Sequence, residues 1–517
     1  MPPPRAHSPV PRRPLLPAST ELRLLHAAAH QQLQEPIPGY SYTALLQRSA
    51  ATSDPRLAAS LHAALLKPGL LASHVFLCNH LLIACFKSRL QRHGLRLLDE
   101  MPRRNAASWS AAIAGLTRGG RPFEALALFR RMRRAGLPPN EFALVSALNA
   151  SSFVGGTGFG RARQLYALAV RLGFDSNVFL TNAYLAAMVR HGQLADAVRL
   201  FDNANALDTV SWNTLLAGFA HHSCVHLCTL WRRMVIEGVG ADGFSFSTVL
   251  SGLAANANLA SGLQVHAQLV KNGFADDVCV GNSLLEMYMK NNELESGTRA
   301  FAEMRRRDVV SWTEMAAGCL HCGLPAKSLR VVSDMMLDGT KPNNHTFATA
   351  AKACAKLASL NQGKKIHGHV IKLGEDPDVR VSNALIDMYA KCRSVSCAHK
   401  VFQLMQYRPV ISWTAMIMAF VQSSGQEREA LKVFDDMLLR GISPNYATFV
   451  CALYACSQGG FVDEHRIYFN AMADKFGVEP REYHHACMVD LLGKAGHHIE
   501  EAEETVSGTP FRPGVLG

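Results

Sequence analysis

The sequence of 517 residues predicts an all-α solenoid of stacked two-helix repeats. Tryptophan recurs at intervals of 103, 100 and 101 residues, in the series Trp109, Trp212, Trp312 and Trp413. Asparagine recurs at the same intervals, in the series Asn79, Asn182, Asn282 and Asn383. Two independent series with one period indicate a duplicated unit. Apolar residues recur at helical spacing and no stretch alternates as a β-strand would, so the duplicated unit is expected to be helical.

The second helix of several units has one apolar face. Apolar residues stand at i, i+3, i+4 and i+7 in two clear cases, Ala125, Leu128, Phe129 and Met132, and Ala430, Val433, Phe434 and Met437. A glycine and then a proline follow each of three such helices, at Gly136 and Pro138, Gly339 and Pro342, and Gly441 and Pro444. Glycine just past a helix and proline beyond it are typical helix stops. Each unit is therefore expected to bury one helix face against its neighbours.

Composition limits the class of protein. The 53 Lys and Arg residues exceed the 41 Asp and Glu residues, and the resulting charge of +12 favours a polyanionic partner. Thirteen cysteines without a framework spacing indicate a reducing compartment and argue against a secreted, disulfide-bonded protein. The longest uncharged windows contain polar residues such as Asn213 and His221, so we interpret them as buried repeat helices and predict no membrane span.

The first 38 residues differ in composition from the rest. They are rich in proline, carry Arg5, Arg12 and Arg13, and contain no acidic residue before Glu21. They also lack the long apolar core of a secretory signal. This composition resembles an organelle transit peptide, and a disordered proline-rich tail is the alternative. A mitochondrial address is our first prediction and a plastid address the alternative.

About fourteen units of three types are expected between residues 39 and 513. A type with Ser-Trp near its start covers 106–140, 209–242, 309–343 and 410–445. A second type covers 39–74, 141–177, 243–277, 344–378 and, in modified form, 446–481. A short type covers 75–105, 178–208, 278–308, 379–409 and, in degenerate form, 482–513. Residues 514–517 are left as a tail.

With these three types in alternation, the chain resembles a plant pentatricopeptide-repeat (PPR) protein of the PLS class. Three segments are particularly similar to that family: Val-His-Ala-Gln-Leu-Val-Lys-Asn-Gly-Phe at 265–274, Asn-Ala-Leu-Ile-Asp-Met-Tyr-Ala-Lys at 383–391 and Ala-Cys-Met-Val-Asp-Leu-Leu-Gly-Lys-Ala-Gly at 486–496. The Ser-Trp units correspond to P repeats, the second type to L repeats and the short type to S repeats. The resemblance implies a right-handed superhelical solenoid, similar to tetratricopeptide arrays.

The resemblance also implies binding of single-stranded RNA, one base to each repeat. The family's base-reading residues are the fifth and the last of a repeat. Carried over, the pairs are Asn79 with Asn105, Ser110 with Asn140, Asn182 with Asp208, Asn213 with Asp242, Asn282 with Asp308, Thr313 with Asn343, and Thr414 with Asn445. Asn383 is an eighth reader, although Pro409 replaces its partner. Amide and hydroxyl groups can both donate to and accept from a base edge.

A purely structural explanation competes with this interpretation. Asn and Asp at the end of a unit are good helix caps, and a polar residue in a first helical turn is ordinary. The predicted residues taken together favour base recognition over a purely structural role, because the fifth residue is Asn, Ser or Thr in every P and S unit from 75 to 445. The family's preferences predict the RNA C-A-N-U-U-N-U-A-N-Y-A, with N opposite L units and Y opposite Asn383. Val145, Ala348 and Val450 offer little at the fifth position of L units.

No complete catalytic motif is found. Zinc nucleobase deaminases need His-x-Glu followed by Pro-Cys-x-x-Cys, and the sequence contains no Pro-Cys pair. His498 and Glu500 match only the first half of that signature. We therefore expect no catalytic residue, no metal and no cofactor.

Two further patterns are interpreted structurally. Cys319 and Cys322 have a zinc-like spacing but no second pair, so core packing is the favoured interpretation. His62, His266 and His367 share one register in L units, and we expect them to pack or bond between helices.

The functional prediction is a non-enzymatic, organellar protein that binds single-stranded RNA by sequence. PLS-class relatives specify cytidine-to-uridine editing sites, and catalysis would here be supplied in trans by an editing factor or deaminase. Two alternatives stay open, which are stabilisation or processing of a transcript by occupying it, and a protein-binding helical scaffold. A truncated or degenerate copy is a further interpretation of how the chain ends.

Overall fold

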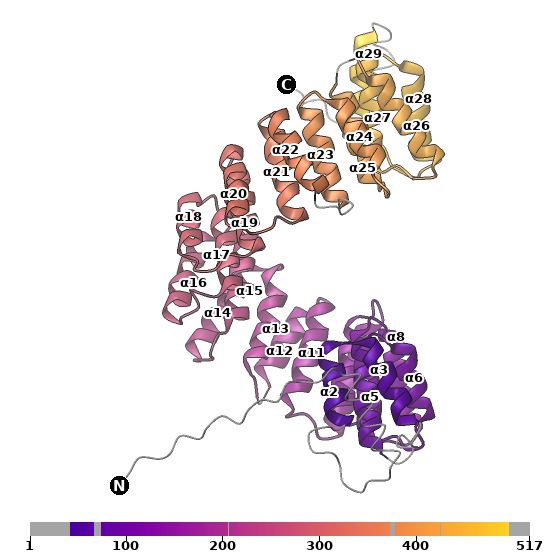
Figure 1. Ribbon diagram of the computed structural model, residues 1–517, viewed down its shortest axis with the longest axis vertical. Helices are drawn as coiled ribbons and strands as arrows, with labels where there is room; N and C mark the ends of the chain where they lie inside the picture. Colours follow the sequence, from indigo (N-terminus) through magenta and orange to yellow (C-terminus); the bar gives the residue numbers. More distant parts are fainter. Residues whose placement is uncertain (1–41, 67–73, 205, 373–377, 424, 496–517) are drawn as a thin grey trace. The chain divides into compact units, whose positions relative to one another are not determined.

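The computed structural model describes residues 42–66, 74–204, 206–372, 378–423 and 425–495 (Figure 1). Within these ranges the 27 assigned elements are all α-helices, and no strand is found among them. The all-α prediction is therefore confirmed. The chain divides into two compact halves, Met1–Ser245 and Phe246–Gly517, which we describe separately.

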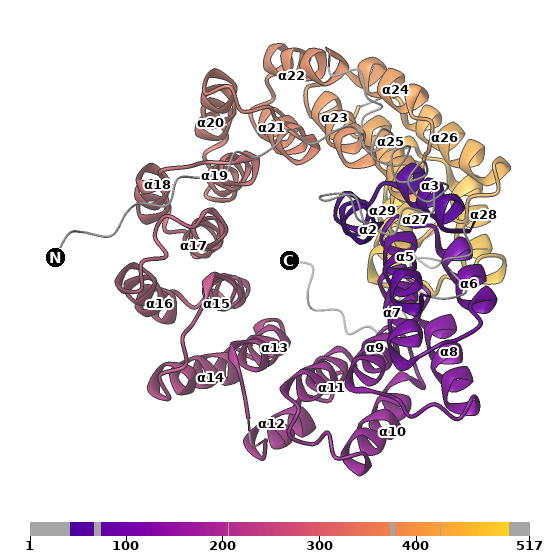
Figure 2. The same ribbon diagram turned by 60° about the horizontal axis from the view of Figure 1, so that its bottom comes forward.

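The N-terminal half is a run of helix pairs. Its helices are α2 (Tyr42–Thr52), α3 (Pro55–Leu66), α5 (Val75–Lys87), α6 (Gln91–Glu100), α7 (Ala106–Arg118), α8 (Pro122–Arg134), α9 (Glu141–Ser152), α10 (Gly158–Arg171), α11 (Val178–Arg190), α12 (Leu194–Asp202), α13 (Thr209–Ala220) and α14 (Cys224–Ile236). The first helix of each pair lies beside the first helix of the next pair, and these helices, α5, α7, α9, α11 and α13, form one row (Figure 2). The second helices of the pairs, α6, α8, α10, α12 and α14, flank that row.

The C-terminal half repeats the pattern. Helix α15 (Gly243–Ala255) crosses the division, and it is followed by α16 (Leu259–Lys271), α17 (Val278–Lys290), α18 (Leu294–Glu303), α19 (Val309–His321), α20 (Pro325–Leu337), α21 (Asn344–Lys356), α22 (Leu360–Lys372), α23 (Val379–Lys391), α24 (Val395–Leu404), α25 (Val410–Val421), α26 (Glu427–Leu439), α27 (Tyr446–Gly459), α28 (Val462–Asp474) and α29 (Glu482–Ala495). From α5 onward, every first helix begins at the first residue of a predicted repeat.

Local sequence explains where the helices stop. Gly136, Gly339 and Gly441 have φ angles of 76°, 83° and 71°, the left-handed region that glycine enters without a steric cost. The second helices α8, α20 and α26 end two residues before these glycines. The predicted stops are confirmed.

Packing follows the predicted faces. The two apolar sets on α8 and α26 are buried, from Ala125 to Met132 and from Ala430 to Met437. Each later tryptophan of the series meets a phenylalanine of the preceding repeat edge to face, as Trp212 does with Phe201 at 4.7 Å between ring centroids. Trp312 with Phe301 and Trp413 with Phe402 have the same arrangement at 4.9 and 4.8 Å. The hundred-residue period is thus a recurring aromatic contact between adjacent repeats.

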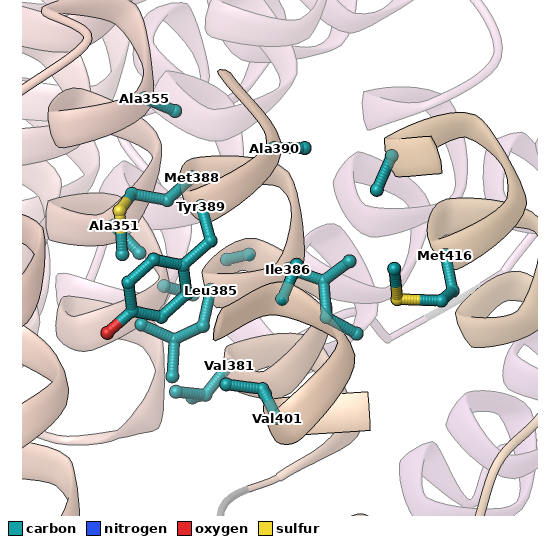
Figure 3. Packing of buried hydrophobic residues seen from close by; sticks show 14 of the residues in the cluster. Ala351, Ala355, Val381, Leu385, Ile386, Met388, Tyr389, Ala390, Val401 and Met416 are labelled. Atoms are coloured by element: carbon teal, nitrogen blue, oxygen red, sulfur yellow. The ribbon is translucent and has the colours of Figure 1, made fainter. Parts of the chain in front are cut away.

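The core of the C-terminal half runs continuously from repeat to repeat. Around α23, Val381, Leu385 and Met388 point toward α21 and Ile386 toward the next first helix, where Met416 lies (Figure 3). Each layer is completed by its neighbour, so consecutive repeats share one continuous core, as in other solenoids.

Two sequence predictions fall on residues that the structure does not describe. These are the transit-peptide interpretation of residues 1–38 and the half-motif formed by His498 and Glu500. Across the ranges it does describe, no helix is both long and apolar enough to span a bilayer.

Candidate nucleic-acid interface

The predicted base-reading residues lie at the junctions between repeats. Each fifth residue is the fifth residue of a first helix, from α5 to α25, and lies at the start of its second turn. Its predicted partner is the residue immediately before the next first helix. A pair separated by about 30 residues in sequence is therefore expected to meet in space.

The four Asn pairs are brought into direct contact. Side-chain Nδ2 donates to the partner's Oδ1 over 3.0 Å in Asn182 with Asp208, 3.1 Å in Asn213 with Asp242, 3.2 Å in Asn282 with Asp308, and 3.3 Å in Asn79 with Asn105. One geometry is thus repeated in both halves of the chain.

The hydroxyl pairs differ among themselves. Ser110 Oγ donates to Asn140 Oδ1 over 2.8 Å. Thr313 does not bond Asn343 directly, because its Oγ1 lies 2.7 Å from Thr346 Oγ1, which in turn is 3.0 Å from Asn343 Oδ1. Thr414 is linked to Asn445 through Thr448 in the same way, over 2.7 and 2.9 Å.

The last residues are also helix caps, as the structural explanation held. Asp208 Oδ1 accepts from the backbone N–H of Ser211, and the equivalent oxygens of Asn105, Asp308, Asn343 and Asn445 cap their helices likewise. Capping uses only one end of the side chain. Across the described ranges, no side chain bonds the second oxygen of Asp208, Asp242 or Asp308, or Nδ2 of Asn105, Asn140, Asn343 or Asn445.

The acidic caps are held as carboxylates. Partial burial raises the pKa of Asp208, Asp242 and Asp308, but hydrogen bonds from the following serine and from the fifth-position Asn outweigh it. Each pKa is therefore lowered from its ordinary value. An Asp cap presents a charged acceptor oxygen at neutral pH, whereas an Asn cap presents two N–H donors.

Exposure divides the two members of a pair. Ser110, Asn213 and Thr313 are buried, at 7%, 7% and 6% exposed, while the other fifth residues are half-buried. Most of their partners are exposed, including Asn105, Asp242, Asp308, Asn343 and Asn445. Any ligand would therefore meet the caps over a larger area than the fifth residues.

Comparison with known proteins adds the family. A model described as "PPR repeat" matches residues 107–137, 282–309 and 381–410, and one described as "PPR repeat family" matches 408–458. The pentatricopeptide repeat-containing protein At1g03540 of Arabidopsis thaliana is 34% identical over 425 residues, which cover 81% of this chain and 68% of the relative. The chain belongs to the pentatricopeptide repeat family.

Other PPR proteins are longer than the part matched here. The chain spans 62% of At3g53360 of Arabidopsis thaliana, whose name adds "mitochondrial", at 32% identity over 92% of its own length. It spans 41% of another Arabidopsis PPR protein, to which it is 33% identical over 79% of its own length.

A solved structure shares the PPR fold. The crystal structure of the pentatricopeptide repeat protein PPR10 from maize superposes with a TM-score of 0.62 at 19% identity, covering 95% of this chain and 81% of the maize chain. The maize protein has also been crystallised with an 18-nucleotide psaJ RNA element, and that structure superposes with a TM-score of 0.47 at 17% identity, covering 95% and 87%.

Sequence reasoning missed the second residue of each PPR unit. This residue is an exposed, large apolar side chain in many units: Phe76, Phe142, Phe179, Val210, Phe244, Val310 and Ile411. It stands three residues before the fifth position, so the two share one helix face. Exposed apolar residues at a fixed register were the available signal.

The third residue of the following unit was also missed. Ser108, Ser211, Ser245 and Ser311 each place Oγ 2.6 Å from Oδ1 of the preceding fifth-position Asn. After L units the third residue is apolar, at Leu180, Val280 and Val381. Alternation between hydroxyl and apolar residues at this position could have revealed it.

The L units use their last residues differently. Asn177 Nδ2 donates to Glu141 Oε2 over 2.8 Å, and Asp378 Oδ2 accepts from Arg380 Nε over 3.0 Å. In units 141–177 and 344–378 the atoms that P and S caps leave unbonded are therefore occupied, whereas among the described residues Asp277 of unit 243–277 accepts only backbone N–H groups, through Oδ1. This difference agrees with the weak fifth positions of the L units.

The remaining candidates have structural roles. His266 and His367 bond the hydroxyls of Tyr288 and Tyr389 over 2.6 and 2.8 Å, between helices as predicted. Cys319 is buried in the core of its unit. In the portion of the chain described, no group of three or more His, Cys, Asp or Glu side chains is placed to hold a metal ion.

Proposed function

We propose that this PPR protein binds single-stranded RNA by sequence, with one base opposite each P or S unit. The observation that carries the proposal is the repeated junction, in which a fifth residue bonds a helix cap whose outward atoms no other side chain occupies. An exposed apolar side chain stands beside each of several junctions. Polar groups for base edges and apolar surface for base faces thus alternate at one spacing.

The cap decides between two classes of base. Uracil and guanine carry an N–H at the centre of the Watson–Crick edge, which matches the carboxylate oxygen of Asp208, Asp242 or Asp308 that no side chain bonds in the described ranges. Adenine and cytosine carry a bare nitrogen there, which matches the N–H donors of an Asn cap. This chemistry agrees with the uracils assigned to the Asp units and the adenines and cytosine assigned to the Asn units.

Base faces would rest on the second residues. Stacking against an exposed side chain tolerates any base and adds affinity without selectivity. Phe179 and Val210 lie on adjacent first helices, one repeat apart, so a base could lie between them while its edge meets Asn182 and Asp208. The surplus of basic residues would support the phosphates.

The biological setting is part of the proposal. A mitochondrial relative and the composition of residues 1–38 support an organelle, with the mitochondrion first and the plastid as the alternative. The PLS alternation supports a role in specifying a cytidine-to-uridine editing site, with a deaminase acting in trans. The RNA-bound crystal structure of maize PPR10 supports RNA as the partner.

A mobility-shift series tests the proposal. One RNA carries C-A-N-U-U-N-U-A-N-Y-A, and the others carry a single base change opposite each P or S unit or a scrambled order. We expect the matched RNA to bind best and binding to weaken steeply with added salt. Equal binding of all scrambled RNAs would overturn base reading, and no RNA binding at any salt would favour a protein-binding scaffold.

A further inference from the structure

The junction after unit 379–409 lacks the arrangement found at the other Asn junctions. Pro409 precedes α25, where other P units have Asp or Asn as the cap. Across the described residues, Asn383 Oδ1 and Ser412 Oγ are both buried and have no hydrogen-bond partner. Ser412 occupies the position from which Ser108, Ser211 and Ser311 bond the preceding Asn. The same residue type at the same register therefore makes the bond in some units and not in this one.

The cap explains the difference. At α13, the backbone N–H of Asp208 donates to Ser211 Oγ over 3.2 Å, while Asp208 Oδ1 accepts from the backbone N–H of Ser211 over 2.9 Å. This box fixes the hydroxyl, whose closest acceptor is Asn182 Oδ1 at 2.6 Å. Proline has neither a backbone N–H nor a side-chain oxygen. The box cannot form at Pro409, and nothing holds the Ser412 hydroxyl toward Asn383.

The box controls which end of the reading amide faces outward. With Nδ2 on the cap and Oδ1 on the serine, Asn182 has both ends fixed. Turning the amide over would place its oxygen against the carboxylate oxygen of Asp208 and break that bond, and Ser211 Oγ would have to accept from Asn182 and turn its hydrogen to Asp208 Oδ1. Without the box, either end of the Asn383 amide can face a base. Cytosine and uracil differ by exchanging donors and acceptors on their edges, so a reversible amide fits both.

The next inference rests on the proposed function. We propose that a Ser or Thr at the third residue of one unit is a positioning residue for the base selectivity of the unit before it. It fixes the orientation of the fifth-position side chain through the helix-capping box. Thr346 and Thr448 fill this place for Thr313 and Thr414. Unit 379–409, where the box is broken, reads cytosine and uracil alike. Where Ala143 lacks a hydroxyl, Ser110 bonds the cap oxygen of Asn140 itself.

A gain of selectivity, and its dependence on Ser412, tests the inference. Pro409→Asp supplies a cap, an N–H and a carboxylate, and α25 should begin as α13 and α19 do. We expect the ratio of binding to RNAs with U and with C opposite this unit to rise from near one to about fivefold or more. Ser412→Ala alone should leave that ratio near one, because its hydroxyl has no partner. Combined with Pro409→Asp, it should remove part of the gain.

The converse variant uses an intact junction. Ser311→Ala should lower the preference for U over C opposite unit 278–308 by about 2- to 10-fold, the worth of one hydrogen bond. Ser311→Thr should retain the preference, since Thr346 and Thr448 serve in the same place. A purely structural role would reduce melting temperature and affinity for all RNAs equally, and would leave this ratio unchanged.

The outcomes separate this inference from the proposed function. If single-base changes opposite unit 209–242 alter binding, but Pro409→Asp gains no preference or Ser412→Ala removes none of its gain, the positioning role is wrong and RNA reading stands. If Ser311→Ala leaves the U-to-C ratio unchanged, the positioning role is also wrong. If no base change at any unit alters binding, base reading itself fails and the positioning role fails with it.

Discussion

Exchanging one oxygen for one amide group at a cap should reverse a base preference without unfolding the repeat. In Asp242→Asn, the retained Oδ1 can still accept from Ser245 N, Ser245 Oγ and Asn213 Nδ2, which now lie at 2.8, 2.9 and 3.1 Å. Only the outward atom changes, from an acceptor to a donor. The chain already uses Asn caps at α7 and α21, so the helix should start normally.

The size of the effect follows from the single contact involved. A well-matched polar contact to a base contributes about 1 to 3 kcal/mol of discrimination, or about 5- to 150-fold in relative affinity. The wild type should prefer U over C opposite unit 209–242 by a ratio in this range, and Asp242→Asn should prefer C. Losing the charge near a helix N-terminus should cost at most about 1 kcal/mol of stability.

Competition binding with two RNAs that differ only at this base provides the assay. The ratio of affinities is the readout, because removing a negative charge should strengthen binding to every RNA. Asn343→Asp is the matched reverse exchange, and it should move unit 309–343 from adenine toward guanine. A ratio that stays constant in both variants, with melting temperatures near that of the wild type, would refute cap-based selection.

Three further predictions follow from other parts of the structure. Phe179→Ala should weaken RNA binding by about 1 to 3 kcal/mol for any base at its junction. Thermal stability should not change, because the Phe179 side chain is 74% exposed. A loss of stability without a loss of binding would contradict the stacking role. Trp212→Ala should lower the free energy of unfolding in urea by about 3 to 5 kcal/mol, since Trp212 is 1% exposed and packs edge-on against Phe201. A loss below about 1 kcal/mol would show that the aromatic contact does not hold the two repeats together. Burial lowers the pKa of His465 to about 4. Below about pH 6.5 the unfolded chain therefore binds a proton at this residue that the folded chain does not bind until about pH 4. The free energy of unfolding should fall by up to about 3 kcal/mol as pH drops from 6.5 to 4. His465→Leu should reduce that fall, and an unchanged pH profile would contradict the assignment.

The repeat period was strong enough to predict the helical layout. Apolar helix faces, glycine stops and the tryptophan register are local or periodic features. The structure confirms the apolar faces on α8 and α26 and the stops after α8, α20 and α26, and it places the tryptophans at one position of α7, α13, α19 and α25. The aromatic partner of each tryptophan was not predicted, because Phe201 and Trp212 belong to different units and their contact depends on how one layer packs on the next.

The sequence likewise predicted only part of the candidate site. Sequence named the fifth and last residues, and the structure places four Asn pairs and Ser110 with Asn140 in direct contact. It could not show that Thr313 reaches Asn343 only through Thr346, since that depends on the length of a side chain across a junction.

The sequence by itself determined the repeats, their helices and the register of polar residues, because each follows from spacing along one chain. Only the tertiary structure decided which end of each side chain is engaged. Capping, the serine contact and the gap at Pro409 arise where two consecutive repeats meet. A hydrogen bond has a direction and a distance of about 3 Å, and neither is set until the layers are stacked.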